Sequence, residues 1–220
     1  MKKTYNIIIL VLLIILQLTY PYLILEILSK LGLNLSNQIK YIVLIPISIS
    51  FMLILYLIYR KDFKKDIKDY KKNIKEYLIL GIKAWILTVL IMIVSNFIIS
   101  IFYTSSSTNE VKVQNYLKIY PIYMIFSAII YAPFTEETIY RKCLKNTISN
   151  KYLYIIISGL IFGLLHTLGN ISNTKELLYI IPYGVMGSGF AYLYEKKKNI
   201  LLPITMHIFH NLLVLLISIL

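Results

Sequence analysis

The sequence is poor in cysteine, glycine and acidic residues, and each shortage excludes a class of protein. A single cysteine, Cys143, excludes a framework of disulfides within the chain, and nothing around it has the spacing of a metal cluster or a nucleophile. The eight glycines form no phosphate-binding loop, and no internal repeat of solenoid period is present. Ten acidic residues stand against 23 Lys and Arg, a net charge of +13. Such a charge can indicate nucleic-acid binding, but the sequence offers no soluble domain that would bind it, so we expect no nucleic-acid partner.

Long polar stretches are also lacking, and this predicts a membrane protein. Hydrophobic residues make up 58% of the 220 positions, and the mean hydropathy is +0.72. Several apolar runs are long enough to cross the roughly 30 Å of a bilayer's hydrocarbon core. The sequence therefore predicts an all-α fold, a polytopic membrane bundle of about seven transmembrane helices (six to eight). We place the spans near residues 1–28, 41–59, 77–103, 119–145, 152–168, 177–194 and 200–219.

The distribution of basic residues predicts the orientation of these spans. The first apolar run is too long for the core of a signal peptide and lacks a small-residue cleavage site, so we expect it to be retained. Most Lys and Arg residues lie before the first span and in the connections 60–75, 141–151 and 196–198. Basic connections face the cytosol, so we expect a cytosolic N-terminus and an external C-terminus. The abundance of Ile, Leu, Lys, Asn and Tyr is typical of AT-rich bacterial genomes, which places the chain in a bacterial plasma membrane, in contact with membrane lipids.

We interpret the chain as one membrane domain, 1–220, with N-terminal helices over 1–118 and a catalytic helix core over 119–220. Within the first part, segment 60–77 is basic and has an apolar residue every three or four positions: Phe63, Ile67, Tyr70, Ile74 and Tyr77. This spacing is typical of one face of an amphipathic helix, which could lie on an anionic inner leaflet. A solvated basic loop explains the composition equally well. The polar run 104–109 is expected to be a loop.

Three groups of polar residues interrupt the apolar segments of the second half. Ionisable groups inside a bilayer cost roughly 2.5 to 3.5 kcal/mol each on insertion scales, so a chain that keeps them usually uses them. At 1.5 Å per residue, the three groups reach overlapping depths, about 10 to 21 Å from the inner surface. The sequence therefore predicts an intramembrane active site. The three groups are Glu136, Glu137 and Arg141 in EETIYR, Phe162 and His166 in FGLLH, and His207 and Asn211 in HIFHN.

The spacing within the first group predicts two different roles for its carboxylates. Glu137 and Arg141 are four residues apart, so an intrahelical ion pair is available, and a buried Arg needs such a partner. Glu136 points about 100° away from Glu137 on a helix. It is therefore left free to face a cavity, where it could act as the general base for a water molecule shared with His166.

Two chemistries remain open for these residues. In the first, His207 and Asn211 donate hydrogen bonds to the oxyanion of a tetrahedral intermediate while Glu136 activates water, which implies hydrolysis of an acyl or peptide bond. In the second, Glu136, His166 and His207 bind a divalent metal, in the two-His, one-Glu set of many catalytic zinc sites. No HExxH motif is present, so the sequence does not choose between them. No nucleotide or organic cofactor is indicated.

The three groups, in this order, resemble the EExxxR, FxxxH and HxxxN motifs of the CPBP family of intramembrane proteases. This family includes the type II CAAX prenyl endopeptidases (CAAX proteases) and bacterial bacteriocin-processing and self-immunity proteins. The resemblance covers residues 120–220. It implies a helical membrane (metallo)endopeptidase with catalytic or metal-site residues Glu136, His166, His207 and Asn211, supported by Glu137 and Arg141. Substrates would be peptides or membrane-protein segments, which we expect to be presented from the cytosol or the bilayer, in bacteriocin or pheromone processing or in self-immunity.

Two rival functions and several structural roles also fit the sequence. The chain could be a non-catalytic membrane immunity or interaction protein, or a proton-coupled transporter with Glu136 in its proton relay. The sequence does not indicate an oligomeric state. We interpret Phe162 as packing beneath the site and His210 as a structural residue. Pro133 is expected to kink its helix, and five glycines between 159 and 189 to allow close helix approach.

Overall fold

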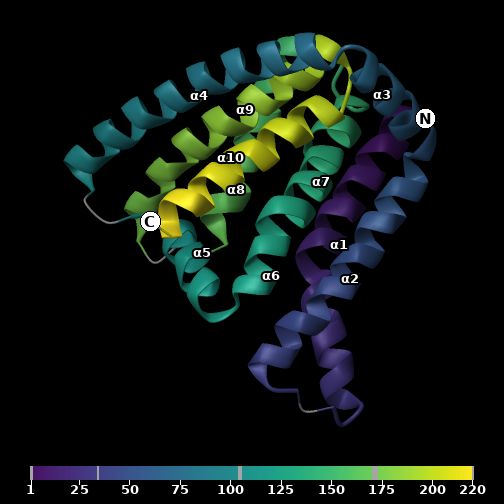
Figure 1. The fold of residues 1–220 in the computed structure, drawn as a ribbon, viewed down its shortest axis with the longest axis vertical. Helices are drawn as coiled ribbons and strands as arrows, with labels where there is room; N and C mark the ends of the chain where they lie inside the picture. Colours follow the sequence, from purple (N-terminus) through teal and green to yellow (C-terminus); the bar gives the residue numbers. More distant parts are fainter. Residues whose placement is uncertain (1, 34, 104–105, 170–172, 220) are drawn as a thin grey trace.

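The chain folds into a bundle of helices (Figure 1). The structure is a computed structural model that describes residues 2–33, 35–103, 106–169 and 173–219, and these residues contain no strand. The prediction of an all-α membrane bundle is confirmed. The α-helices are α1 (Lys2–Lys30), α2 (Asn37–Ile58), α3 (Arg60–Lys72), α4 (Ile74–Phe102), α5 (Thr108–Ile119), α6 (Pro121–Phe126), α7 (Ala132–Glu137), α8 (Lys151–Leu168), α9 (Ile180–Lys197) and α10 (Leu201–Ile219). Two π-helical segments, η1 (Ser127–Tyr131) and η2 (Thr138–Cys143), and a 3₁₀ turn, η3 (Thr174–Tyr179), complete the elements.

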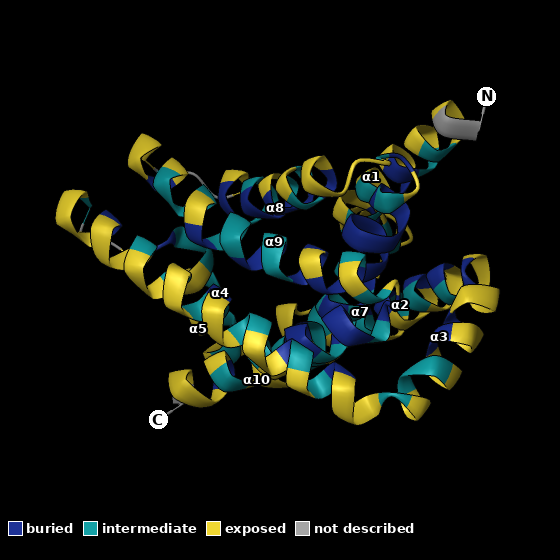
Figure 2. Cartoon of the chain, turned by 90° about the horizontal axis from the view of Figure 1, so that it is seen from above, coloured by how far each residue is buried: buried dark blue, intermediate teal, exposed yellow. Residues whose placement is uncertain are grey.

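Six segments of the described chain are long and apolar enough to cross a membrane. They are Thr4–Lys30, Asn37–Ile58, Ile74–Phe102, Lys151–Leu168, Thr174–Lys197 and Leu201–Ser218. Their outward faces carry exposed Ile, Leu, Val and Phe side chains, seen as yellow turns along α4 in Figure 2. Only 11% of the apolar window of α4 is buried within the protein. A soluble protein rarely exposes so much continuous apolar surface, so these faces are suited to lipid.

The predicted span 119–145 is not among these six, and its local structure explains why. The chain is helical from α6 to η2, but two π-helical segments interrupt it, before and after α7. It also carries Glu136, Glu137, Arg141 and Lys142 within a few residues. Figure 1 shows α6 and α7 as one continuous path through the centre of the bundle. The second half of this path, α7 and η2, is therefore largely buried and polar, whereas α6 is apolar and has no buried residue.

The basic segment 60–77 is not the single amphipathic helix that its spacing suggests. Helix α3 ends before Asn73, whose side chain donates to the backbone carbonyl of Asp69, and α4 begins at Ile74. The apolar face of α3 packs on the protein: Phe63 is buried and stacks on Phe134, with ring centroids 5.2 Å apart. The Asp66 carboxylate accepts from the backbone N–H of Ile200, just before α10 begins. Helix α3 thus contacts both α7 and the start of α10, two elements that carry predicted active-site residues.

The connection between α4 and α6 contains a helix that the sequence interpretation lacked. Within the run 104–109, which was expected to be a loop, Thr108 and Asn109 already belong to α5, while residues 104–105 lie outside the described part. Ser107 caps this helix, since its side chain accepts from the backbone N–H of Glu110 at 3.2 Å. The described residues 107–109 of this run therefore form a helix start, which is a common use of serine and threonine.

Helices α8 and α9 pack closely because glycines line their contact. A Cβ atom on Gly163 would lie 2.5 Å from the carbonyl oxygen of Ile180, and one on Gly187 would lie 2.6 Å from the Cβ of Phe162. Only a residue without a side chain allows such an approach. The prediction of close packing at these glycines is confirmed. The contact fixes α8, which carries His166, against α9.

Candidate active site

The central cavity, of about 350 Å³, lies between η1, α7, α8, α9 and α10 and extends to α4 and α5. Its lining includes the four predicted catalytic residues, Glu136, His166, His207 and Asn211. They come from three separate helical segments of the second half of the chain. The structure therefore brings the four side chains to one space, while their chemical roles stay predictions.

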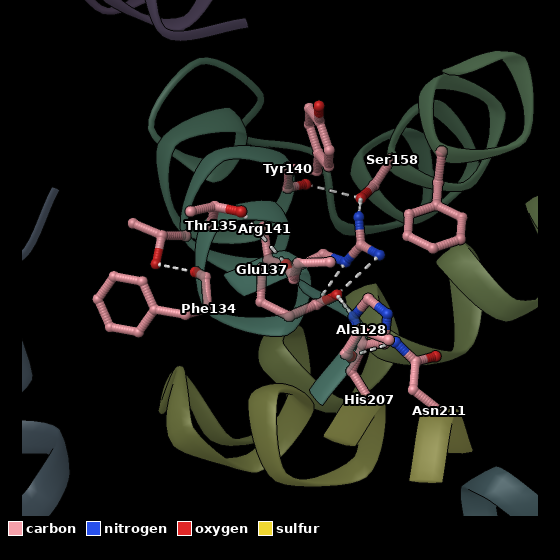
Figure 3. Close-up of polar contacts among 12 residues, drawn as sticks. Ala128, Phe134, Thr135, Glu137, Tyr140, Arg141, Ser158, His207 and Asn211 are labelled. Carbon is pink, nitrogen blue, oxygen red and sulfur yellow. Dashed lines mark hydrogen bonds and ion pairs between the residues drawn. The ribbon is translucent and has the colours of Figure 1, made fainter. Parts of the chain in front are cut away.

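Glu137 lies at the centre of a buried network beside this cavity. Its Oε2 is 2.9 Å from Nε of Arg141, and its Oε1 accepts from Nη2 of Arg141 at 3.3 Å. Both side chains are fully buried. Nη1 of Arg141 donates to Ser158 Oγ at 3.0 Å, and Ser158 donates to the Tyr140 carbonyl (Figure 3). The predicted ion pair is present, and Ser158 anchors it to α8.

The same carboxylate also holds His207. Nδ1 of His207 lies 2.9 Å from Oε1 of Glu137, and because a carboxylate only accepts, this nitrogen carries the proton. The imidazole is buried and stacks on Phe190, with ring centroids 4.9 Å apart. These contacts fix the ring and leave Nε2 as its free nitrogen. The pairing of Glu137 with His207 links α7 to α10 (Figure 3), and sequence spacing gave no sign of it.

Glu136 has different surroundings from its neighbour. Its Oε2 is buried and has no hydrogen-bond partner among the described residues. No described Lys or Arg forms an ion pair with it, whereas Glu137 has Arg141. An unpaired buried carboxylate oxygen is costly unless it serves a ligand or a water molecule. The predicted division between the two adjacent glutamates therefore matches the geometry.

The orientation of His166 is fixed by its own helix, α8, and by α9. Its Nδ1 lies 2.9 Å from the carbonyl oxygen of Phe162, so Nδ1 must donate and Nε2 has the lone pair. The imidazole lies between two rings, with Phe162 at 4.1 Å and Tyr183 at 5.1 Å between centroids. Phe162 thus packs beneath the site, as the sequence suggested. Tyr183 is a positioning residue that the sequence analysis missed, because only the tertiary packing of α9 brings it to His166.

Asn211 holds α10 against η1. Its Nδ2 donates to the carbonyl oxygen of Ala128 at 2.8 Å. In a π-helical register this carbonyl would accept from the backbone N–H of residue 133, as Ser127 does from Ala132. Residue 133 is proline and has no N–H. The side chain of Asn211 therefore replaces a donor that Pro133 removes, and one amide hydrogen of Asn211 remains for another partner.

His210 also lines the central cavity. Its Nδ1 accepts from the indole N–H of Trp85 at 3.4 Å, which ties α10 to α4. This contact agrees with the structural role that we assigned to His210.

A metal ion shared by three side chains does not fit the geometry of the described residues. No three His, Cys, Asp or Glu side chains among them are close enough to hold one ion. Within the predicted set, the Nδ1–H of His207 already donates to Glu137. Glu136 and His166 line the cavity but do not form a ligand cluster with His207. The metal stays a prediction, and no chemical step below depends on it.

Comparison with known proteins agrees with this site. Residues 118–213 match the family model described as type II CAAX prenyl endopeptidase Rce1-like. This range contains all seven motif residues named above, and it confirms the resemblance inferred from the motifs. At the family level, the match supports a membrane peptidase. No solved structure matches the chain.

Three curated relatives each match about half of the chain. "Putative membrane peptidase YdiL" of Bacillus subtilis is 30% identical over 115 residues, 51% of this chain and 43% of that protein. An uncharacterised Mycoplasma capricolum protein is 35% identical over 104 residues, 46% of this chain and 30% of that protein. The UPF0177 protein YvdC of Lactococcus lactis is 26% identical over 115 residues, 51% and 42% of the two chains. The chain thus spans less than half the length of these relatives.

Proposed function

We propose that this protein is an intramembrane endopeptidase in which Glu136 and His166 activate a water molecule. One observation carries the proposal: the two adjacent glutamates have opposite surroundings. Glu137 contacts both Arg141 and His207, whereas Glu136 lines the central cavity and its buried Oε2 has no partner among the described residues. A purely structural carboxylate pair would need partners for both members. The match of residues 118–213 to a peptidase family supports the same reaction class.

The two groups can hold water through complementary acceptors. The Glu136 carboxylate accepts one hydrogen of the water molecule, and Nε2 of His166 accepts the other, because its Nδ1 proton is bound to the Phe162 carbonyl. Transfer of the first proton to Glu136 leaves the water oxygen to attack the peptide carbonyl carbon. The protonated Glu136 then gives this proton to the leaving amine. The carboxylate is thereby restored, and the atoms and protons balance.

The opposite wall can stabilise the oxyanion that forms. Asn211 has one amide hydrogen that is not used by Ala128. His207 donates through Nε2 when its ring is doubly protonated, while its Nδ1–H donates to the Glu137 carboxylate 2.9 Å away. Both donors are held in place by these contacts, Asn211 by the Ala128 carbonyl and His207 by the Glu137 carboxylate. The donors are therefore already oriented when negative charge develops on the carbonyl oxygen, which is the basis of oxyanion stabilisation.

A metal would supply a different source of hydroxide, and elemental analysis separates the two mechanisms. We propose measuring zinc in purified wild-type protein and in His166→Ala. Cleavage by metal-free wild-type protein is expected from the carboxylate mechanism described here. Stoichiometric zinc in the wild type, absent in His166→Ala and required for cleavage, would replace it with the metal mechanism.

The cavity lining indicates from which end a substrate enters. It reaches Ser107 and Ser218, at the α5 end of the bundle, and Figure 1 shows α5 far from α3 and the N-terminus. We therefore propose access from the α5 end, opposite to the cytosolic entry that the sequence led us to expect. If the basic segments face the cytosol of a bacterial cell, α5 lies outside. Peptides or membrane-protein segments exposed there, including bacteriocin or pheromone precursors, are the proposed substrates.

The test is to compare peptide termini in cells that express the wild type or Glu136→Gln at matched levels. New termini should occur only with the wild type, because Gln cannot take the proton from water. Glu26→Gln, which changes an exposed carboxylate away from the cavity, is the matched control and should retain cleavage. Identical termini in all three strains, with all proteins folded, would contradict the proposal. A phenotype that survives in Glu136→Gln would indicate a non-catalytic protein, and pH-driven solute flux without new termini a transporter.

A further inference from the structure

The lining of the central cavity is acidic, although the chain as a whole is strongly basic. The chain has 23 Lys and Arg against 10 Asp and Glu. The described residues that line the cavity include two carboxylates, Glu110 and Glu136, and no Lys or Arg. A cleft lined by charge of one sign, with low-dielectric walls, concentrates ligands of the opposite sign. The cavity is therefore suited to a positively charged ligand.

Glu110 lies on the cavity face of α5. Together with Val113 and Gln114, three and four positions further along the chain, it forms one face of this helix, and all three residues line the cavity. Glu110 is exposed, and no ion pair to its carboxylate occurs among the described residues. The carboxylate is thus available to a ligand that enters at the α5 end.

The position of Glu110 relative to the active site is fixed through Tyr183. The hydroxyl of Tyr183 forms a hydrogen bond of 2.9 Å with Ser107 Oγ and accepts from Asn109 Nδ2 at 3.3 Å. These two residues closely precede Glu110 at the start of α5. The ring of the same tyrosine stacks on His166, with centroids 5.1 Å apart. One side chain therefore connects the start of α5 with the proposed water-binding histidine.

The backbone N–H of Glu110 also takes part in the helix cap, a contact that does not need the charge of the side chain. Ser107 and Glu110 have the S-x-x-E spacing of a capping box, and the Ser107 side chain accepts from the Glu110 N–H. Glutamine serves at this position of a capping box as well as glutamate does. A Glu110→Gln variant therefore keeps the helix cap and removes only the negative charge. This separates the two roles experimentally.

We propose that Glu110 binds a Lys or Arg side chain of the substrate, so that the enzyme selects cationic peptide segments. The proposal rests on the proposed function, because the same cavity would hold the peptide bond to be cleaved. Glu136 contributes negative charge deeper in the cavity but takes part in the reaction. Glu110 has no part in the reaction and acts on binding and selectivity alone.

The first test measures binding without cleavage. Protease-resistant D-amino-acid peptides that differ at one position, Lys, norleucine or Glu, are titrated into the full chain in zwitterionic lipid nanodiscs, with empty nanodiscs as the background. We expect the Lys peptide to bind about threefold tighter than the norleucine peptide, the range of an exposed ion pair. The preference should shrink at about 0.5 M salt because of screening. It should disappear in Glu110→Gln and persist in Glu26→Gln.

Equal binding of the Lys and norleucine peptides by the wild type would overturn the inference, as would a preference that survives in Glu110→Gln. A second test uses the corresponding L-peptides and compares kcat/KM. Cleavage without charge preference would refute the inference and leave the proposed function intact. Charge-selective binding of the D-peptides without cleavage of any L-peptide would refute the proposed function and leave Glu110 as a cation-binding residue.

Discussion

Two adjacent residues of this protein, Glu136 and Glu137, have different surroundings because a helix turns by about 100° per residue. Glu137 points into a network with Arg141, Ser158 and His207, and Glu136 points into the cavity. Removing one partner of a buried ion pair typically costs about 3 to 5 kcal/mol, because the other charge remains without compensation. The network is therefore suited to fix His207. The cost of burying Arg141 is offset by three contacts to acceptor oxygens, two on Glu137 and one on Ser158, and by the ring of Phe162, whose centroid lies 5.1 Å from the guanidinium carbon.

The hydrogen bond between Asn211 and Ala128 gives a prediction at the level of single residues. Asn211→Ala should destabilise the protein by about 1 to 3 kcal/mol, because a buried carbonyl loses its donor. In a Pro133→Ala background the cost should be smaller, since an alanine at that position supplies a backbone N–H that can reach this carbonyl. Thermal unfolding of the four proteins in detergent, followed by a thiol-reactive dye that reports exposure of the buried Cys143, measures the difference. Equal costs in the two backgrounds would show that Pro133 and Asn211 are independent.

Spacing in the sequence predicted the residue-level contacts that lie within one helix, and only those. The Glu137–Arg141 pair follows from a separation of four residues and is confirmed. The contacts of Glu137 with His207 and of His166 with Tyr183 join different helices. Their formation depends on helix rotation and depth, which no local pattern specifies. The catalytic roles of Glu136, His166, His207 and Asn211 stay predictions until the variants are measured.

At the level of elements, the π-helical segments distinguish the motif-bearing path from the other spans. Segment η1 lies directly before α7 and η2 directly after it, so both glutamates lie between two wide turns. Single π turns are frequently found at functional sites because they redirect side chains within a helix. The sequence predicted a kink at Pro133, but it did not predict the π-helical turns. Asn211 supports the first of these turns, η1, because its side chain donates to the Ala128 carbonyl.

The glycines between α8 and α9 give a prediction at this level. Gly163→Ala should lower the unfolding temperature, because its Cβ would lie 2.5 Å from the Ile180 carbonyl oxygen and force backbone to move, at about 1 to 3 kcal/mol. Gly184→Ala is the matched control in the same contact, since its nearest neighbour would be at an ordinary 3.4 Å. Unfolding temperatures in the same detergent measure both. A control variant as unstable as Gly163→Ala would show that helix propensity or another cause, rather than this contact, determines the result.

At the level of the whole molecule, charge is separated between the two ends of the bundle. The basic helix α3 and the α9–α10 connection lie at the same end as the N-terminus, whereas α5 lies at the other end (Figure 1). The central cavity, with its two carboxylates, extends toward α5. Most of the positive charge therefore lies at the end opposite the proposed substrate entrance, although α5 itself carries Lys112 and Lys118.

This arrangement predicts the orientation of the protein in the membrane. In a Cys143→Ser background, Ser106→Cys and Lys64→Cys place single thiols at exposed positions, before α5 and on α3 respectively. A membrane-impermeant maleimide should label the thiol at position 106 in intact cells and the thiol at position 64 only after permeabilisation, because basic segments stay in the cytosol. The reverse pattern would place the cavity entrance inside and return substrate entry to the cytosolic side.

The sequence by itself determined the helical membrane class, six of the seven predicted spans and the polar residues that line the cavity, because hydropathy, charge and motif spacing are properties of local segments. Tertiary structure decided the rest. It placed Glu137 between Arg141 and His207, left the buried Oε2 of Glu136 without a partner among the described residues, and packed α3 against the bundle. It also revealed α5 and its Glu110 at the cavity. These features depend on how helices far apart in the chain rotate and pack against one another, which is set by the summed contacts of the whole bundle.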